Sequence, residues 1–148
     1  MEVSSVLLDT SAYIHLMKGH AAVSEAAGKA DRVVLSPVVV GELLWGFRKS
    51  KFRKRNEEHL AKFLARPTVE LVAVDGDTAE RYAAVKGSLL EAGTSVPVND
   101  LWIAASAMQH GLAVVTTDSD FLRIPQVLVR HFEARGDRPL LRPRRRKE

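Results

Sequence analysis

The chain has 148 residues, of which 46% are hydrophobic, and a formal net charge of +4. This length suits one domain with a buried core, and the apolar content argues against a disordered chain. Because the sequence has no cysteine, it excludes disulfides, zinc–thiolate centres and thiol nucleophiles. It contains neither an apolar run long enough to cross a bilayer nor a start typical of a secretory signal, so we expect a cytoplasmic protein without membrane contacts.

Five apolar runs alternate along the chain with segments of helical pattern. The runs predicted to be strands are residues 3–8, 32–36, 69–74, 112–117 and 127–132. This alternation predicts an α/β fold, a three-layer sandwich in which helices flank a mostly parallel sheet of four to five strands. Within the third helical gap, Asp77 followed by Glu80 indicates a capping box.

Basic residues are concentrated in two segments. Residues 135–148 contain seven arginines or lysines against two acids, so we expect a domain at 1–134 followed by a flexible basic tail at 135–148. The other segment contains Arg48, Lys49, Lys51, Arg53, Lys54 and Arg55. These six side chains, hereafter the basic cluster, are candidates to contact RNA phosphates; the other interpretation, which we rank first, is a solvated face whose neighbouring aromatic residues pack inward.

Four carboxylates are predicted to meet at one edge of the sheet. Asp9 and Asp118 follow the first and fourth strands, and parallel sheets bind ligands beyond the carboxyl ends of their strands. Asp100 begins the helix that leads into the fourth strand, so it lies at the same edge. Glu42 projects from an apolar face early in the helix after the second strand. Each has a structural alternative: a helix cap for Asp9 and Asp100, a turn for Asp118, and a salt bridge for Glu42.

Four carboxylates at one place repel one another unless a cation lies between them. Ligands that are all oxygen favour Mg²⁺ or Mn²⁺ over zinc, and such an ion can hold a phosphate oxygen and acidify a water molecule. Glu42 is a candidate to orient that water. The pattern therefore predicts metal-assisted hydrolysis of a phosphodiester. Nearby hydroxyl groups that can support the carboxylates belong to Thr10, Ser11, Thr116 and Thr117.

Four motifs resemble the acidic motifs of PIN-domain nucleases, and more narrowly those of the VapC toxins of toxin–antitoxin pairs. They are, in order, "LLDTS", "GELLWG", "VNDLWIAA" and "VTTDSDFLRIP". The resemblance extends from Val6 to His131. It implies a dimeric endoribonuclease that depends on Mg²⁺ or Mn²⁺ and is inhibited by a cognate antitoxin, which grips the helices around the basic cluster and often inserts a basic side chain into the acidic pocket.

The resemblance also implies the roles of individual residues. The acidic site would consist of Asp9, Glu42, Asp100 and Asp118, with Asp9, Asp100 and Asp118 nearest the metal. The last motif is more compact than in many relatives, so Asp118 is assigned to the site and Asp120 to a supporting position.

Other functions fit parts of the pattern. A phosphatase with a nucleophilic aspartate after the first strand usually has a second aspartate two residues later, where this chain has Ser11. A PIN-like module that binds RNA or protein without cleaving it, and a housekeeping RNA-processing nuclease, are the remaining alternatives. Trp45 and Trp102 lie close to acidic positions in sequence, and we expect both to be core residues rather than platforms for base stacking.

Overall fold

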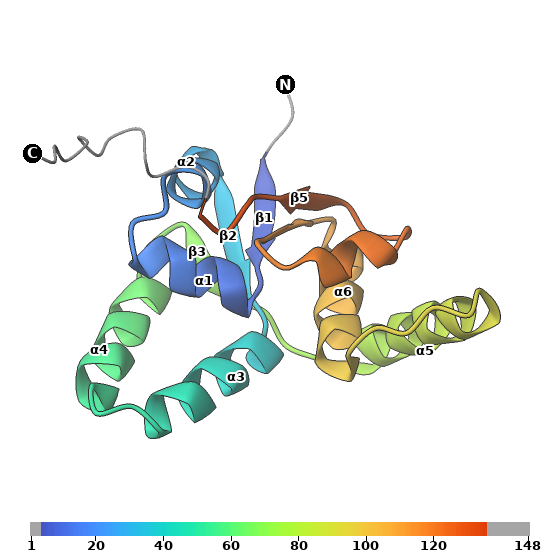
Figure 1. The fold of residues 1–148 in the computed structure, drawn as a ribbon, viewed down its shortest axis with the longest axis horizontal. Helices are drawn as coiled ribbons and strands as arrows, with labels where there is room; N and C mark the ends of the chain where they lie inside the picture. The colour runs from blue at the N-terminus through green and yellow to red at the C-terminus, as the bar shows by residue number, and fades with distance from the viewer. Residues whose placement is uncertain (1–3, 136–148) are drawn as a thin grey trace, which may run out of the picture.

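The computed structural model describes residues 4–135 as a five-stranded parallel sheet flanked by helices (Figure 1). The strand order is β3-β2-β1-β4-β5, and every neighbouring pair is parallel. The predicted fold class is therefore confirmed, with strands shorter than the apolar runs. Their bounds are β1 Ser5–Leu8, β2 Arg32–Leu35, β3 Val69–Leu71, β4 Ala113–Thr116 and β5 Val129–His131.

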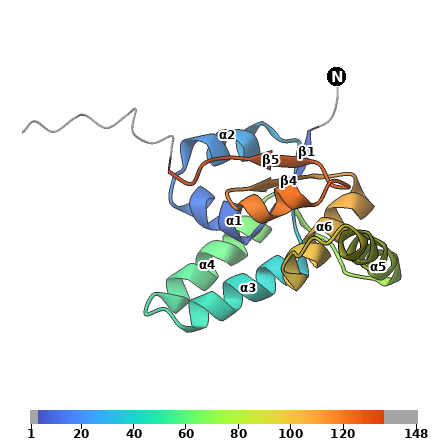
Figure 2. The same ribbon diagram turned by 45° about the vertical axis from the view of Figure 1, so that its right-hand side comes forward.

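The helices group into pairs around this sheet. Figures 1 and 2 show α3 and α4 extending from one side of the sheet and the packed pair α5 and α6 from another. The predicted tail lies outside the described residues, apart from Arg135. The helices are α1 Thr10–Met17, α2 Ala21–Lys29, α3 Pro37–Arg48, α4 Arg53–Leu64, α5 Gly76–Glu91 and α6 Val98–His110, with a 3-10 helix, η1, at Ser119–Arg123.

The central strand β1 anchors the core. Val6, Leu7 and Leu8 are buried because β1 has a neighbouring strand on each side and helices pack on the sheet. On either side of β1 the chain winds in opposite directions, toward β2 and toward β4. In open parallel sheets such a reversal opens a crevice at the carboxyl edge, which is where the residue after β1, Asp9, lies.

Local signals set the ends of the helices that flank this edge. Ser36 caps α3 by accepting from the backbone N–H of Val39, and Pro37 takes the first helical position. Helix α6 ends at Gly111, whose φ of +67° is left-handed. The predicted capping box at Asp77 is wrong: α5 is capped by Asp75, whose side chain accepts from the N–H groups of Asp77 and Thr78, while the Thr78 hydroxyl accepts from the Asp75 N–H.

The two tryptophans have different surroundings. Trp102 is partly buried and its ring stacks on Tyr82, with 4.0 Å between the ring centroids. Trp45 is 60% exposed, so the prediction that it is a core residue is wrong. It lies on α3, which extends beyond the sheet and buries only Val39 and Leu43.

Candidate metal centre at the carboxyl edge of the sheet

Asp9 is fixed in place by hydrogen bonds to both of its carboxylate oxygens. One oxygen accepts from the Ala12 N–H and from the Ser11 hydroxyl, both at 2.8 Å, and the other accepts from the Thr116 hydroxyl at 2.6 Å. The side chain is buried, and burial raises its pKa despite these donors. Asp9 therefore caps α1, as the structural alternative proposed, and in the same orientation it lies at the acidic edge.

Asp100 lies in the first turn of α6 and interacts with every other carboxylate of the predicted site. Its pKa is raised to about 7, first by burial and then by repulsion from Asp118, Asp120, Asp9 and Glu42. The structure thus brings the four predicted carboxylates together, with Asp120 as a fifth. The helix N-terminus favours a negative charge at this position, but burial and four like charges outweigh it.

Three of the carboxylates form a close set. Asp100, Asp118 and Asp120 each offer an oxygen atom, and these atoms lie within 4.8 Å of one another. Asp118 caps η1 by accepting from the Asp120 N–H at 3.0 Å. This hydrogen bond keeps the Asp118 and Asp120 side chains in the same cluster. Asp120 also binds Arg123 through a 2.6 Å contact. Asp120, predicted only as support, is therefore part of the close set, whereas Asp9 lies beside it.

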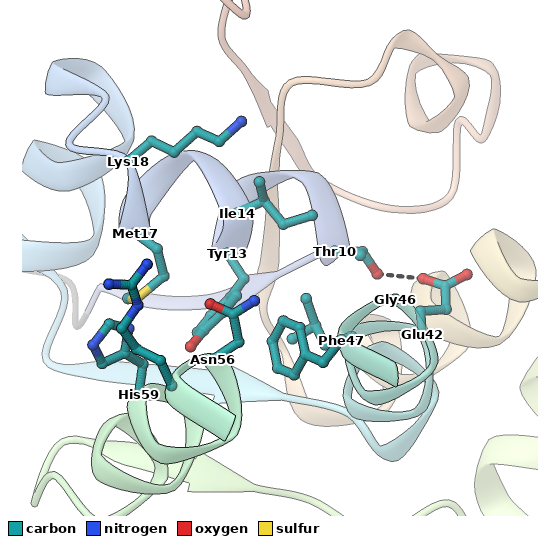
Figure 3. A pocket seen from close by; sticks show the side chains of 12 residues that line it. Thr10, Tyr13, Ile14, Met17, Lys18, Glu42, Gly46, Phe47, Asn56 and His59 are labelled. Carbon is teal, nitrogen blue, oxygen red and sulfur yellow. Dashed lines mark hydrogen bonds between the residues drawn. The ribbon is translucent and has the colours of Figure 1, made fainter. Parts of the chain in front are cut away.

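Glu42 is held by neutral donors. The Thr10 hydroxyl donates to one carboxylate oxygen (Figure 3). The side-chain amide of Asn99 donates to the other at 2.8 Å. Within residues 4–135 no ion pair to Glu42 is present, so the salt-bridge alternative is wrong there. Asn99 was not predicted as a site residue; its position directly before Asp100, at the start of α6, was the available signal.

Three of the four predicted hydroxyl groups contact these carboxylates: Ser11 and Thr116 contact Asp9, and Thr10 contacts Glu42. The hydroxyl of Thr117 lies 3.4 Å from Nδ1 of His15 instead. The Ser11 hydroxyl also accepts from the N–H of Thr117, which ties α1 to the end of β4. The donors that surround the cluster are thus fixed by the meeting of two chain segments that are distant in sequence.

The arrangement fits a hard divalent cation. Three carboxylate oxygens in close proximity match the oxygen ligands of Mg²⁺ or Mn²⁺, which retain water molecules in the remaining positions. Burial and the neighbouring carboxylates raise the pKa of Asp100, although Arg123 pairs with Asp120 of the same set. A bound cation would favour the ionised carboxylates.

A groove leads away from the acidic edge. It has a volume of about 640 Å³, lies between α1, α3 and α4, and has Glu42 and Thr10 at one end (Figure 3). Its wall is largely apolar and includes Ile14, Met17 and Phe47. The buried hydroxyl of Tyr13 also lines the groove and has no hydrogen-bond partner among the described residues.

The basic cluster lies at the far end of α3 and the start of α4. All six side chains are exposed, and Arg55 also lines the groove. The neighbouring aromatic residues do not all pack inward, because Phe52 is 49% exposed.

Among the described helices, none is long and apolar enough to span a membrane.

Comparison with known proteins gives consistent matches. The model of the PIN domain family matches residues 6–127. Ribonuclease VapC5 of Mycobacterium tuberculosis is 35% identical over 115 residues, 78% of this chain and 84% of that protein. Ribonuclease VapC4 of the same organism is 32% identical over 129 residues, 87% of this chain and 98% of that protein.

Solved structures share the fold. The VapBC-5 toxin–antitoxin structure from Mycobacterium tuberculosis contains a chain with 30% identity and a TM-score of 0.68, covering 87% of this chain and 99% of that one. The DNA-bound VapBC structure from Salmonella typhimurium contains a chain with 26% identity and a TM-score of 0.76, covering 88% of this chain and 98% of that one.

Proposed function

Since the chain belongs to the PIN-domain family, and within it to the VapC ribonucleases, we propose that it is a metal-dependent endoribonuclease and the toxin of a toxin–antitoxin pair. The observation that supports this proposal is the clustering of Asp9, Glu42, Asp100, Asp118 and Asp120 at the carboxyl edge of the sheet. We further propose that it acts as a homodimer in the cytoplasm.

In the proposed mechanism each carboxylate has its own role. Asp100 and Asp118 would hold Mg²⁺ or Mn²⁺ together with Asp9, and Asp120 belongs to the same close set. The ion, when bound, supplies charge neutralisation at the scissile phosphate and an acidified water. Glu42, oriented by Thr10 and Asn99, accepts a proton from the attacking water.

The hydrogen bonds behind the carboxylates preserve this geometry. The hydroxyls of Thr116 and Ser11 and the N–H of Ala12 donate to the Asp9 carboxylate. These three hydrogen bonds keep the carboxylate from rotating when the charge at the site changes. Because the Asp9 carboxylate is already oriented, the site needs little reorganisation when substrate binds.

The groove is the proposed contact site of the antitoxin. Its apolar wall suits the apolar face of a peptide segment, and its end at Glu42 places such a segment next to the acidic cluster. An arginine or lysine at the end of that segment would neutralise the carboxylates and block access of RNA. The two solved structures above are of VapBC toxin–antitoxin proteins, which accords with a protein inhibitor for this chain.

The test of the enzyme is cleavage of a mixed panel of transfer, ribosomal and messenger RNA by the purified protein. We expect cleavage with Mg²⁺ or Mn²⁺, none with EDTA, and none with Asp9→Asn, which keeps a residue able to cap α1. The matched control is Asp75→Asn, because Asp75 is also a helix cap but belongs to α5. Cleavage by Asp9→Asn at the wild-type rate would indicate a contaminating nuclease. Absence of cleavage in every lane, with RNA still bound, would favour the non-catalytic module.

A further inference from the structure

Trp45 is an exposed aromatic residue that the fold leaves without a covering element. It is 60% exposed, although burial of a tryptophan ring would remove a large apolar area from water. The apolar groove does not account for it, because on α3 the groove is lined by Leu43, Gly46 and Phe47 together with Glu42. Trp45 therefore belongs to a different surface of the same helix.

That surface connects the acidic edge to the basic cluster. Glu42, Trp45 and Lys49 are three and four residues apart, so they follow one another along one side of α3 and its C-cap. The Lys49 ammonium lies 5.0 Å from the centroid of the Trp45 ring, a cation–π distance. With a rise of 1.5 Å per residue, the ring lies about one helical turn from the Glu42 position.

We propose that this surface binds single-stranded RNA, with an unpaired base stacked on the Trp45 ring and a phosphate bound by Lys49. The inference rests on the proposed nuclease function, and it assigns to Trp45 and Lys49 the contact with an unpaired base and its phosphate. Stacking on an aromatic ring is tolerant of sequence because every base has a flat face. A paired base is hidden within its helix and is not available to the ring.

The charge around Trp45 favours RNA over a second copy of the chain. The basic cluster lies next to the ring along the chain, and its six side chains are exposed. Two copies joined through this face would bring like charges together, whereas a polynucleotide neutralises them. Phe52 extends the same pattern, with the Arg55 guanidinium 4.7 Å from its ring centroid.

The test uses the fluorescence of Trp45 itself. The chain has two tryptophans, so the Trp102→Phe variant leaves Trp45 as the only indole. The probe is a 12-nucleotide single-stranded RNA of mixed sequence, added in EDTA so that cleavage does not interfere. The same RNA annealed to its complement and heparin, a polyanion without bases, are the comparison ligands. We expect saturable quenching by the single strand, little by the duplex and none by heparin.

Variants of the full chain then measure the contribution to affinity. Trp45→Leu should weaken binding of the single strand by roughly 5- to 150-fold, the range for loss of one stacked base, and Trp45→Phe should restore most of it. Leu44→Ala is the matched control, because Leu44 is the neighbouring exposed apolar residue of α3, and it should bind as the wild type does. Lys49→Gln should reduce the salt slope by about 0.7, the value for one phosphate of a single strand.

The proposal is wrong if Trp45 is not quenched at saturating RNA or if Trp45→Leu binds RNA as the wild type does. It is also wrong if Trp45 fluorescence depends on protein concentration without RNA, because a second copy would then cover the ring. None of these measurements requires cleavage. If RNA quenches Trp45 but the protein cuts no RNA, the nuclease function is refuted and the binding surface is kept. If the protein cuts RNA without quenching of Trp45, the nuclease function is kept and the binding surface is refuted.

Discussion

Replacement of Asp100 by asparagine should stabilise the metal-free protein, and the gain should depend on pH. Asp100 has a pKa raised from 3.8 to about 7. As pH rises from about 4 to 7, the unfolded chain loses this proton while the folded chain retains it, so the stability of the wild type falls across that range. Above pH 7 Asp100 is ionised in both the folded and the unfolded chain, and the wild type has lost all of this stability. Asparagine does not ionise, so the variant does not lose stability in this way.

The size of the effect follows from the shift. A change of about three pKa units corresponds to roughly 4 kcal/mol, and because Asp100 is only about half buried, solvent screening reduces this to about 2 kcal/mol. In EDTA we therefore expect Asp100→Asn to be about 2 kcal/mol more stable than the wild type at pH 8 and more stable by less than half as much at pH 5, since the loss begins near pH 4, where the unfolded chain ionises. The melting temperature at pH 8 should rise by several degrees.

Thermal unfolding followed by circular dichroism, with urea unfolding for the free energies, measures this difference. Asp31→Asn is the control, because Asp31 is exposed and lies at the opposite, amino end of the strands. Addition of Mn²⁺ should stabilise the wild type more than Asp100→Asn. An equal difference between wild type and Asp100→Asn at pH 5 and pH 8, or a variant that is less stable at pH 8, would refute the account of Asp100 as a carboxylate destabilised by its neighbours.

Three further changes test other parts of the structure. Thr116→Val removes the buried donor to Asp9 and should cost about 1–3 kcal/mol in urea unfolding and weaken Mn²⁺ binding measured by calorimetry; an unchanged Mn²⁺ affinity would separate Thr116 from the site. Gly111→Ala should lower stability by about 1 kcal/mol, because its φ is left-handed, whereas Gly87→Ala within α5, where the added carbon meets nothing within 4 Å, should raise it by a similar amount; the same sign for both would contradict the backbone argument. Truncation after Ala134 should weaken RNA binding and flatten its salt dependence, measured by fluorescence anisotropy; an unchanged slope would exclude the tail from RNA binding.

The fold and the meeting of the carboxylates could be predicted because both follow from order along the chain. Strands alternating with helices give a parallel sheet, and residues that follow its strands, such as Asp9 and Asp118, must lie at one edge. The place of Glu42 followed from Ser36 and Pro37, which fix where α3 starts.

The errors have two sources. The exposure of Trp45 depends on tertiary packing, namely on which side of α3 faces the sheet. The cap of α5 is local: Asp75 precedes Asp77 by two residues, and its side chain accepts from the N–H groups of Asp77 and Thr78. Asn99 and its hydrogen bond to Glu42 join α6 to α3, a long-range contact that no local pattern reports.

The central position of β1 has a consequence for how the protein is made. β1 is synthesised first, but its neighbour β4 begins only at Ala113. Until then Asp9 lacks the Thr116 hydroxyl, and Asp100 lacks the two carboxylates of η1. The acidic cluster is therefore completed only after β4 and η1 have been synthesised, late in the translation of the domain.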